Sequence, residues 1–252
     1  MTPEYAGPAV DVLALGPHPD DVELAVGGTI LKHVAAGRTV AIVDCTRGEL
    51  GTRGTPEVRD AESAEAARLL GVAFRGNLGL RDGALFDDDD ARRRLVRALR
   101  ALRPVVLLAP HDDDLHPDHE RAGRLARDAA FLAGVAKYEP GLPPHRVRAV
   151  LHYPSHRPFA PSFVVDVTAV FEAKRRACLA YKSQFHDPAS RDGATYLSRP
   201  QFWDWWEGSA RHYGKLVGAE YGEPFLHAAP LRIDDVVAAF EDFGYYPKTN
   251  RA

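Results

Sequence analysis

The feature that most constrains this fold is an alternation of short apolar runs with longer amphipathic stretches over the first 135 residues. The short runs are rich in aliphatic residues, and the longer ones repeat apolar residues at helical spacing. This alternation is typical of βαβ units around a parallel sheet. We expect strands at 10–15, 39–45, 72–77 and 104–109, and helices at 22–36, 56–70, 90–102 and 118–133. The alternation predicts an α/β, Rossmann-like fold of three layers with a mainly parallel sheet.

The second half of the chain differs in composition. Beyond residue 141 it is richer in proline, and we expect strands at 147–153 and 162–167 and helices at 170–182 and 200–217. With 252 residues the chain has the length of one core with elaborations, and neither a repeat nor a linker separates a second domain. We therefore expect one domain over 1–252, made of a core (1–135), a C-terminal elaboration that covers the site (136–234) and a loosely attached tail (235–252).

Charge and cysteine content narrow the class of partner. The formal net charge is −3, which removes the electrostatic argument for binding nucleic acid or anionic membranes. Cys45 and Cys178 are too few for a disulfide framework, and no apolar run reaches the length of a membrane helix. The beginning of the chain does not resemble a secretion signal. We expect a cytoplasmic protein with a small-molecule partner, and neither a nucleic-acid nor a membrane partner.

Two histidine–aspartate clusters each follow a predicted strand and open a predicted helix. The first is Pro-His-Pro-Asp-Asp at 17–21, and the second is His-Pro-Asp-His at 116–119. Parallel α/β sheets place ligands beyond the carboxyl ends of their strands. His18 and Asp21 are three residues apart across a turn and can converge, whereas Asp20 points elsewhere. We expect the two clusters to meet at one edge of the sheet.

The residue types in the clusters indicate hydrolysis at a metal ion. An imidazole and a carboxylate from the first cluster and an imidazole from the second form a set that binds Zn²⁺ and leaves a position for water, whose pKa falls to about 7. Asp20 is the best-placed general base. His116, three residues before His119, hydrogen-bonds the oxyanion or protonates the leaving amine, and Asp118 orients one of the histidines. Such a set also accepts Fe²⁺, Co²⁺ or Mn²⁺.

Together with Gly27 and Gly28 in the following helix, these clusters resemble the LmbE-like (PIG-L) zinc N-deacetylases. Those enzymes remove acetyl groups from N-acetylglucosamine derivatives, and their subunits form trimers and hexamers. The resemblance implies a homo-oligomer with one Zn²⁺ per subunit. The implied metal ligands are His18, Asp21 and His119, the implied base is Asp20, and the residue implied to assist the oxyanion is His116. Pro17 departs from the usual alanine or glycine of the family but alters none of these residues.

Four further segments resemble the bacillithiol-pathway branch of that family, the N-acetylglucosaminyl-malate deacetylases. They are 46–55, 162–166, 181–185 and 221–225. The resemblance implies N-acetylglucosaminyl malate as the substrate. Its two carboxylates require arginine forks, which Arg47, Arg53 and Arg59 supply after the second strand. By similarity to relatives that bind inositol-linked glucosamine, the sugar contacts are Glu49, Arg59 and Asp82, which assigns Arg53 to malate.

Other interpretations of the same residues stay open. The metal site would equally serve a deacetylase of another N-acetylglucosaminide or an amidase of thiol conjugates. A different class is a non-catalytic Rossmann-like module that binds a sugar or nucleotide, with histidines that serve only the structure. Of the remaining acidic and histidine residues, we expect 112–114 to be solvated and His156 to serve packing or the surface. One of the three tryptophans at 203, 205 and 206 is expected in a subunit interface.

Overall fold

The centre of the fold is a sheet of five parallel strands in the order β3-β2-β1-β4-β5. The computed structural model describes residues 5, 7–86 and 88–240. The strands are β1 (Val12–Gly16), β2 (Val40–Asp44), β3 (Phe74–Asn77), β4 (Val106–Pro110) and β5 (Ala149–Tyr153). β1 lies between β2 and β4: the chain adds β2 and β3 on one side of β1 and then crosses back to add β4 and β5 on the other side. The crevice at such a switch point is where open α/β sheets bind ligands.

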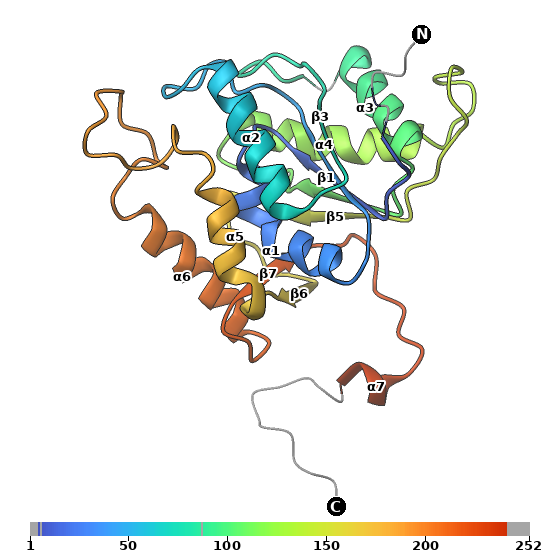
Figure 1. The fold of residues 1–252 in the computed structure, drawn as a ribbon. Coiled ribbons are helices and arrows are strands. Elements are labelled where there is room, and N and C mark those ends of the chain that lie inside the picture. The colour runs from blue at the N-terminus through green and yellow to red at the C-terminus, as the bar shows by residue number, and fades with distance from the viewer. Residues whose placement is uncertain (1–4, 6, 87, 241–252) are drawn as a thin grey trace, which may run out of the picture.

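Helices cover both faces of the sheet (Figure 1). On one face lie α1 (Asp21–Ala35), α2 (Pro56–Leu70) and α5 (Phe171–Cys178), and on the other α3 (Asp89–Leu102) and α4 (Pro117–Leu132). Alternate residues of β1 serve the two layers, since Val12 and Ala14 pack with α1 while Leu13 and Leu15 pack with α3 and α4. The predicted three-layer, mainly parallel α/β fold is confirmed.

The local signals of α2 explain why its predicted bounds match the structure. The Thr55 side chain accepts a hydrogen bond from the backbone N–H of Val58, and Pro56 takes the first helical position. Gly71 ends the helix in the left-handed conformation, with a φ of 71°. The other core elements differ from the expected ranges by at most two residues at an end, which is the usual uncertainty of an element boundary.

The C-terminal elaboration packs beside the face that carries α1 and α5. It contains β6 (Phe163–Asp166), the short 3₁₀ helix Thr168–Val170, α6 (Phe202–Lys215) and β7 (Gly222–Phe225), with β6 and β7 paired antiparallel. The sequence analysis missed β7, a four-residue strand that contains Pro224 and has no β-branched residue. The helix expected at 170–182 ends earlier, at Cys178.

The described part of the expected tail lies apart from the sheet (Figure 1). Its helix α7 (Val236–Phe240) has no buried residue. The remainder of the expected tail, 241–252, lies outside the described residues. In the ranges that are described, no helix combines the length and hydropathy that a bilayer span requires.

Candidate active site

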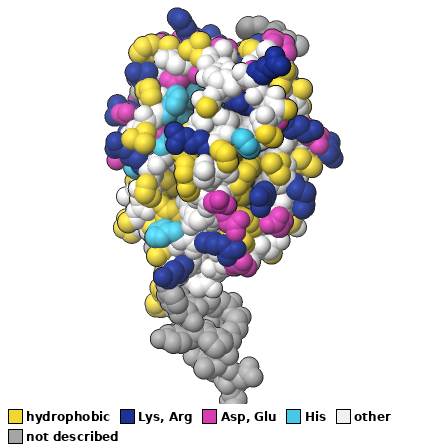
Figure 2. All heavy atoms as spheres, turned by 90° about the vertical axis from the view of Figure 1, so that its left-hand side faces the viewer, with side chains coloured by type: hydrophobic (Ala, Val, Ile, Leu, Met, Phe, Trp, Pro, Cys, Tyr) yellow, Lys and Arg dark blue, Asp and Glu magenta, His cyan; other side chains and the backbone are white. Residues whose placement is uncertain are grey.

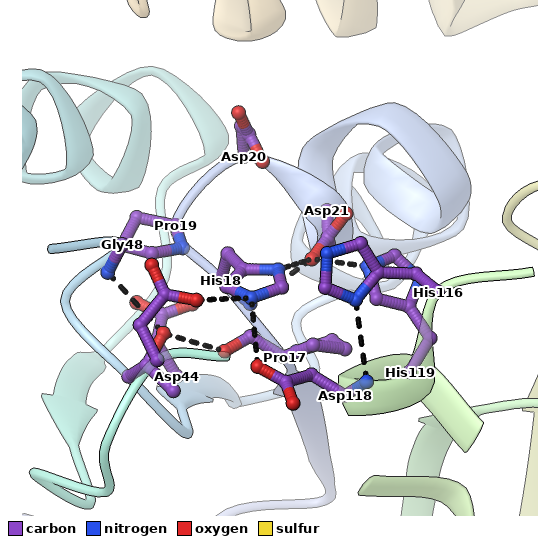
Figure 3. A network of polar contacts seen from close by, with 12 residues as sticks. Pro17, His18, Pro19, Asp20, Asp21, Asp44, Gly48, His116, Asp118 and His119 are labelled. Atoms are coloured by element: carbon purple, nitrogen blue, oxygen red, sulfur yellow. Dashed lines mark hydrogen bonds and ion pairs between the residues drawn. The ribbon is translucent and has the colours of Figure 1, made fainter. Parts of the chain in front are cut away.

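The two histidine–aspartate clusters meet because β1 and β4 are neighbours in the sheet. His18 Nδ1 lies 3.2 Å from Asp21 Oδ2, and His119 Nε2 lies 3.2 Å from the same oxygen (Figure 3). One ligand atom from each of these three residues lies within 4.8 Å of the others. The three side chains, here called the triad, therefore converge on one point at the carboxyl edge of the sheet.

The turn that supplies the first cluster is tight and strained. A Cβ at Gly16 would lie 3.0 Å from an oxygen of Asp44, so the turn leaves little room for a side chain there. Asp20, directly before α1, has a φ of 116°, a region that residues with a side chain rarely adopt. Such a conformation costs about 1–3 kcal/mol and is concentrated at functional sites. The strain marks Asp20 as a residue held by its surroundings.

Each histidine of the triad turns its second ring nitrogen toward a carboxylate. His18 Nε2 lies 3.1 Å from Asp82 Oδ1 and 3.5 Å from Asp118 Oδ2. His119 Nδ1 lies 3.8 Å from Asp114 Oδ1, and it has no hydrogen-bond partner among the described residues although it is buried. Histidines that bind metal commonly have this arrangement, in which a carboxylate holds the ring from behind. The donor set therefore fits a divalent cation.

The electrostatics of the triad favour a positive charge. Burial opposes protonation of His18, but hydrogen bonds to three aspartates raise its pKa well above the ordinary value. Those aspartates are Asp118, Asp21 and Asp82. Burial alone would raise the pKa of Asp21, yet His119 and His18 hold it well below the ordinary value. The carboxylates around the two histidines thus give the site an excess of negative charge, which favours a cation where the triad converges.

Asp20 stands beside the triad in a buried ion pair. Figure 3 shows its side chain turned away from the three ligand atoms. Its Oδ2 lies 3.1 Å from Arg59 Nη2, and the same guanidinium donates to the carbonyl of Pro19. Burial raises the pKa of Asp20 to about 7, although the charge of Arg59 opposes this. A carboxylate with that pKa exchanges a proton near neutral pH, as a general base must.

His116 caps α4 and is held in one tautomer. Its Nδ1 accepts a hydrogen bond from the backbone N–H of Asp118 at 3.2 Å, so the ring proton sits on Nε2. Burial and the nearby histidines of the triad lower the pKa of His116, which keeps the ring neutral. The Asp118 carboxylate accepts from Gly83 N at 2.7 Å and faces His18. Asp118 thus contacts His18 through its carboxylate and donates a hydrogen bond to His116 through its backbone N–H.

Two of the predicted sugar contacts border the triad. Glu49 accepts hydrogen bonds from the backbone N–H groups of Asp82 and Arg47, at 2.8 and 3.1 Å. Asp82 accepts from Leu50 N at 2.8 Å and contacts His18. Arg47 is exposed and pairs with Asp60. The loops after β2 and β3 therefore place the Asp82 carboxylate against His18 and the Glu49 carboxylate against the Asp82 backbone.

The other two predicted substrate residues are buried. The guanidinium of Arg53 donates from Nε to Ser183 O at 2.9 Å and from Nη2 to Phe185 O at 3.4 Å. It ties the loop after α5 to the core and is not free to bind a carboxylate, so this geometry does not support the predicted malate contact. Arg59 likewise faces Asp20 rather than the open side, which does not support a direct sugar contact.

Two residues of the site were missed in the sequence analysis. Asp114 was expected in solvent, but it is buried and accepts hydrogen bonds from the backbone N–H groups of His116 and His156, at 2.9 Å each. His156 donates from Nδ1 to Asp114 at 2.7 Å and packs its ring against His119. The signal available for His156 was its position after β5, the neighbour of β4.

Comparisons with known proteins agree with this site. The family described as PIG-L, GlcNAc-PI de-N-acetylase, matches residues 13–130, which contain both clusters. The diacetylchitobiose deacetylase of Thermococcus kodakarensis is 32% identical over 247 residues, covering 87% of this chain and 86% of the relative. This chain belongs to the PIG-L family. Members of the PIG-L family are metal-dependent N-deacetylases, so membership makes this chain an enzyme rather than a non-catalytic module.

Two further relatives show how far the PIG-L likeness extends. The solved structure of a conserved protein from Thermus thermophilus is 43% identical, has a TM-score of 0.82 and covers 90% of this chain and 98% of that one. The 1D-myo-inositol 2-acetamido-2-deoxy-α-D-glucopyranoside deacetylase of Thermobispora bispora is 33% identical over 175 residues, 56% of this chain and 58% of the relative. The first of these likenesses thus spans most of the chain, and the second spans about half of it.

Proposed function

We propose that this chain hydrolyses the acetamido group of an N-acetylglucosaminide and releases acetate and a free amine. The observation that carries the proposal is the convergence of His18, Asp21 and His119 on one point, with the buried carboxylate of Asp20 beside it. Family membership supports the reaction type. The donor types, two imidazole nitrogens and one carboxylate oxygen, suit an enzyme that works on an amide with water.

The triad would hold one metal ion per subunit, and we propose Zn²⁺. When bound, such an ion supplies a Lewis acid for the amide carbonyl and lowers the pKa of water. Asp82 and Asp118 behind His18, and Asp114 behind His119, keep the two rings in place for it. The protein thereby fixes the ligand geometry before the substrate arrives.

Asp20 is the proposed general base. It takes a proton from the attacking water and returns it to the nitrogen as the C–N bond breaks. Its pKa of about 7 suits both transfers, since neither the carboxylate nor the acid is then strongly favoured. Arg59 holds the carboxylate from the protein side and limits its motion. The resting orientation toward Arg59 is compatible with this role, because catalytic contacts often tighten only with substrate bound.

His116 is the proposed oxyanion donor. Because Nδ1 accepts from the Asp118 backbone, only Nε2 carries a proton, and that N–H stabilises the carbonyl oxygen as it gains negative charge. A neutral imidazole donates a hydrogen bond without losing its proton. The alternative role, protonation of the amine, therefore falls to Asp20. This assignment separates two roles that the sequence analysis left open for His116.

The finer identity of the substrate is also a proposal. The sugar hydroxyls would contact Glu49 and Asp82, which border the triad. N-acetylglucosaminyl malate fits less well than expected, because Arg53 is engaged with backbone carbonyls and the exposed Arg47 already pairs with Asp60. Diacetylchitobiose is favoured by the likeness over most of the chain to the Thermococcus kodakarensis enzyme. The two substrates differ in charge, and activity assays on each compound show which of them the enzyme prefers.

The test is acetate and amine release by zinc-loaded protein from four compounds. They are N-acetylglucosaminyl malate, diacetylchitobiose, an inositol-linked N-acetylglucosaminide and an N-acetylated thiol conjugate. We expect turnover of at least one of the first three, abolished in Asp20→Asn with its zinc retained. The control is Asp204→Asn, an exposed carboxylate on α6. Turnover of the thiol conjugate alone would reassign the enzyme to the amidases, and no turnover by zinc-replete protein would refute the proposal.

Assembly and compartment complete the proposal. We propose a homo-oligomer, a trimer or hexamer, and light scattering after size-exclusion chromatography gives its mass directly. A monomer at micromolar concentration would contradict it. We propose the cytoplasm because Cys45 and Cys178 are both unpaired buried thiols, which suits a reducing compartment. Fractionation of the source cells tests that assignment.

A further inference from the structure

A cavity of about 300 Å³ opens beside the triad. Asp21 and His156 line one end of it, and α6 with the preceding loop lines the other. The loop 186–200 lies at the left of Figure 1, and Figure 2 faces that side, where apolar side chains lie among basic ones and histidines. The cavity adjoins the metal ligands directly and has no role in the reaction derived above.

The walls of the cavity are mainly apolar and aromatic. They include Leu24, Ala25, Leu197, Phe202, Trp206 and Tyr213. Two charged groups in the wall are paired with each other, because Lys174 Nζ lies 2.7 Å from Glu223 Oε1 and both side chains are almost fully buried. The Trp206 indole N–H donates to Leu24 O at 2.9 Å. The other polar residues of the wall include Asp21, Ser155, His156 and Ser209, but most of the lining is apolar and suits an apolar occupant.

The mouth of the cavity carries an exposed aromatic pair. Tyr196 and Trp205 stack with ring centroids 5.8 Å apart, and both residues are about half exposed, at 50% and 44%. A stacked pair of exposed aromatic rings beside a cavity is typical of a surface that meets a ligand or partner. Because both rings also line the cavity, the apolar surface runs from the solvent to the metal ligands.

The lining of the cavity includes neither of the proposed sugar contacts that lie near the triad. Asp82 contacts His18, Glu49 accepts from the Asp82 backbone, and neither residue lines the cavity. The cavity instead begins at Asp21 and His156. An amide held at the triad with its sugar near Glu49 directs the group on the other side of its carbonyl into the cavity. That group is the acyl chain.

The volume is larger than an acetyl group needs. An apolar cavity of about 150 Å³ holds a benzene ring, so this one has room for an acyl chain of several methylenes. We propose that the cavity is an acyl-chain pocket and that the enzyme hydrolyses glucosaminides with N-acyl chains of about four to eight carbons as well as acetyl. This inference rests on the proposed function and names its substrate class more closely.

The reaction with a longer chain balances as it does with acetyl. The oxygen of water bonds to the acyl carbon, the C–N bond breaks, and the proton that Asp20 took from water goes to the nitrogen. The products are a free glucosaminide amine and a medium-chain carboxylic acid. The apolar part of that chain is buried by the cavity in the bound substrate, and its burial favours binding by about 0.8 kcal/mol per methylene.

The experiment compares N-acetyl-, N-butyryl-, N-hexanoyl- and N-octanoylglucosamine as substrates of the zinc-loaded full chain. We expect kcat/KM to rise by about two- to fourfold per added methylene until the cavity is full, the ratio that corresponds to burial of a CH₂ group. The filling variant is Ser209→Phe, since Ser209 lines the cavity from an exposed position on α6 and tolerates a larger residue. Its matched control is Ser209→Ala. We expect Ser209→Phe to lose the gain for long chains and keep the acetyl activity.

A binding measurement complements the kinetics. The three tryptophans of the chain all lie in α6, and two of them line the cavity. Octanoate should therefore change tryptophan fluorescence in the wild type and in Ser209→Ala, and much less in Ser209→Phe. Acetate serves as the control ligand. An unchanged spectrum at saturating octanoate would count against an acyl-chain pocket.

The outcomes separate this inference from the proposed function. Hydrolysis of the acetyl compound without any gain for longer chains overturns the pocket and leaves the deacetylase intact. Failure on every compound by zinc-replete protein overturns the deacetylase, and the acyl preference falls with it. If Ser209→Phe loses diacetylchitobiose activity while the chain-length series is flat, the cavity holds the second sugar, which also overturns the inference.

Discussion

The backbone N–H of Asp118 donates to Nδ1 of His116 at 3.2 Å, and this bond leaves Nε2–H as the proton-bearing side of the ring. The proline between these two residues starts α4, so the cap geometry of the helix also fixes the tautomer of the histidine. A structural feature of the helix end thus prepares a hydrogen-bond donor for the reaction.

The first prediction concerns that donor. His116→Ala should lower kcat by about 10²–10³-fold, because one oxyanion donor is removed, while the zinc content stays at one per chain. The control is His212→Ala, a histidine in the last turn of α6. Steady-state kinetics with metal analysis of the same preparations decide the point. Loss of zinc from His116→Ala would show that this residue binds the metal instead.

The second prediction concerns the pH dependence of the base. Asp20 acts in its carboxylate form, and the charge of Arg59 favours that form, so Arg59→Gln should raise the pKa of Asp20 above about 7. Activity is lost as pH falls through the pKa of a base. The acid limb of the kcat/KM profile should therefore move to higher pH in the variant.

Arg68→Gln is the control for this shift, because Arg68 lies exposed on the same helix and its guanidinium pairs with Glu65. Its profile should match the wild type. An acid limb that stays in place in Arg59→Gln, measured in buffers of constant ionic strength, would rule out Asp20 as the group that controls it.

The third prediction compares two adjacent aspartates. Asp114 is buried and faces His119 Nδ1, whereas Asp113 is exposed and pairs with Arg157. Asp114→Asn should weaken zinc binding by about 10- to 100-fold, the usual effect of removing a carboxylate behind a ligand histidine. Asp113→Asn should leave the affinity unchanged. Competition with a chromogenic chelator measures both, and equal affinities would exclude a positioning role for Asp114.

The fourth prediction concerns a break in α1. The helix loses regular geometry at Val26, where φ is −130°, and the Glu223 carboxylate accepts from the freed N–H groups of Gly28 and Thr29 at 2.8 and 2.7 Å. Lys174 neutralises that carboxylate. Lys174→Met leaves the charge buried without a cation, so it should reduce the free energy of unfolding by about 3–5 kcal/mol.

The matched control for Lys174→Met is Arg211→Met, which removes an exposed ion pair with Glu207 on α6. That change should cost about 1 kcal/mol or less. Urea denaturation followed by circular dichroism gives both values. A loss in Lys174→Met no larger than that of the control would mean that the Gly28 and Thr29 N–H groups alone satisfy the Glu223 carboxylate.

Local chemistry accounts for the part of the fold that the sequence analysis predicted. The bounds of α2 follow from Thr55, Pro56 and Gly71, which are neighbours of the helix they delimit. The parallel sheet follows from the alternation of apolar runs with amphipathic helices. The two histidine–aspartate clusters meet because both follow strands, and the carboxyl ends of parallel strands share one edge.

Side chains of the same type have different burial and different partners in the structure, and no local sequence pattern predicts which. Arg47, Arg53 and Arg59 follow the same strand, yet one is exposed, one binds carbonyls after α5 and one pairs with Asp20. Their partners lie up to 132 residues away in the chain. The sequence analysis assigned all three loop arginines to the substrate. It could not tell which of them are buried, because burial is decided by the segments that pack over a loop and not by the loop itself.

What the sequence determined by itself was therefore the order of elements in the parallel-sheet core, the sheet type and the presence of a histidine–aspartate site at its carboxyl edge. Those depend on spacing and on groups a few residues apart. Only the tertiary structure decided that Asp114 is buried beside exposed Asp113, that His156 joins the site, and that a cavity forms between α1, α6 and β7. Each of these depends on contacts between segments distant in the chain, whose geometry is set by packing.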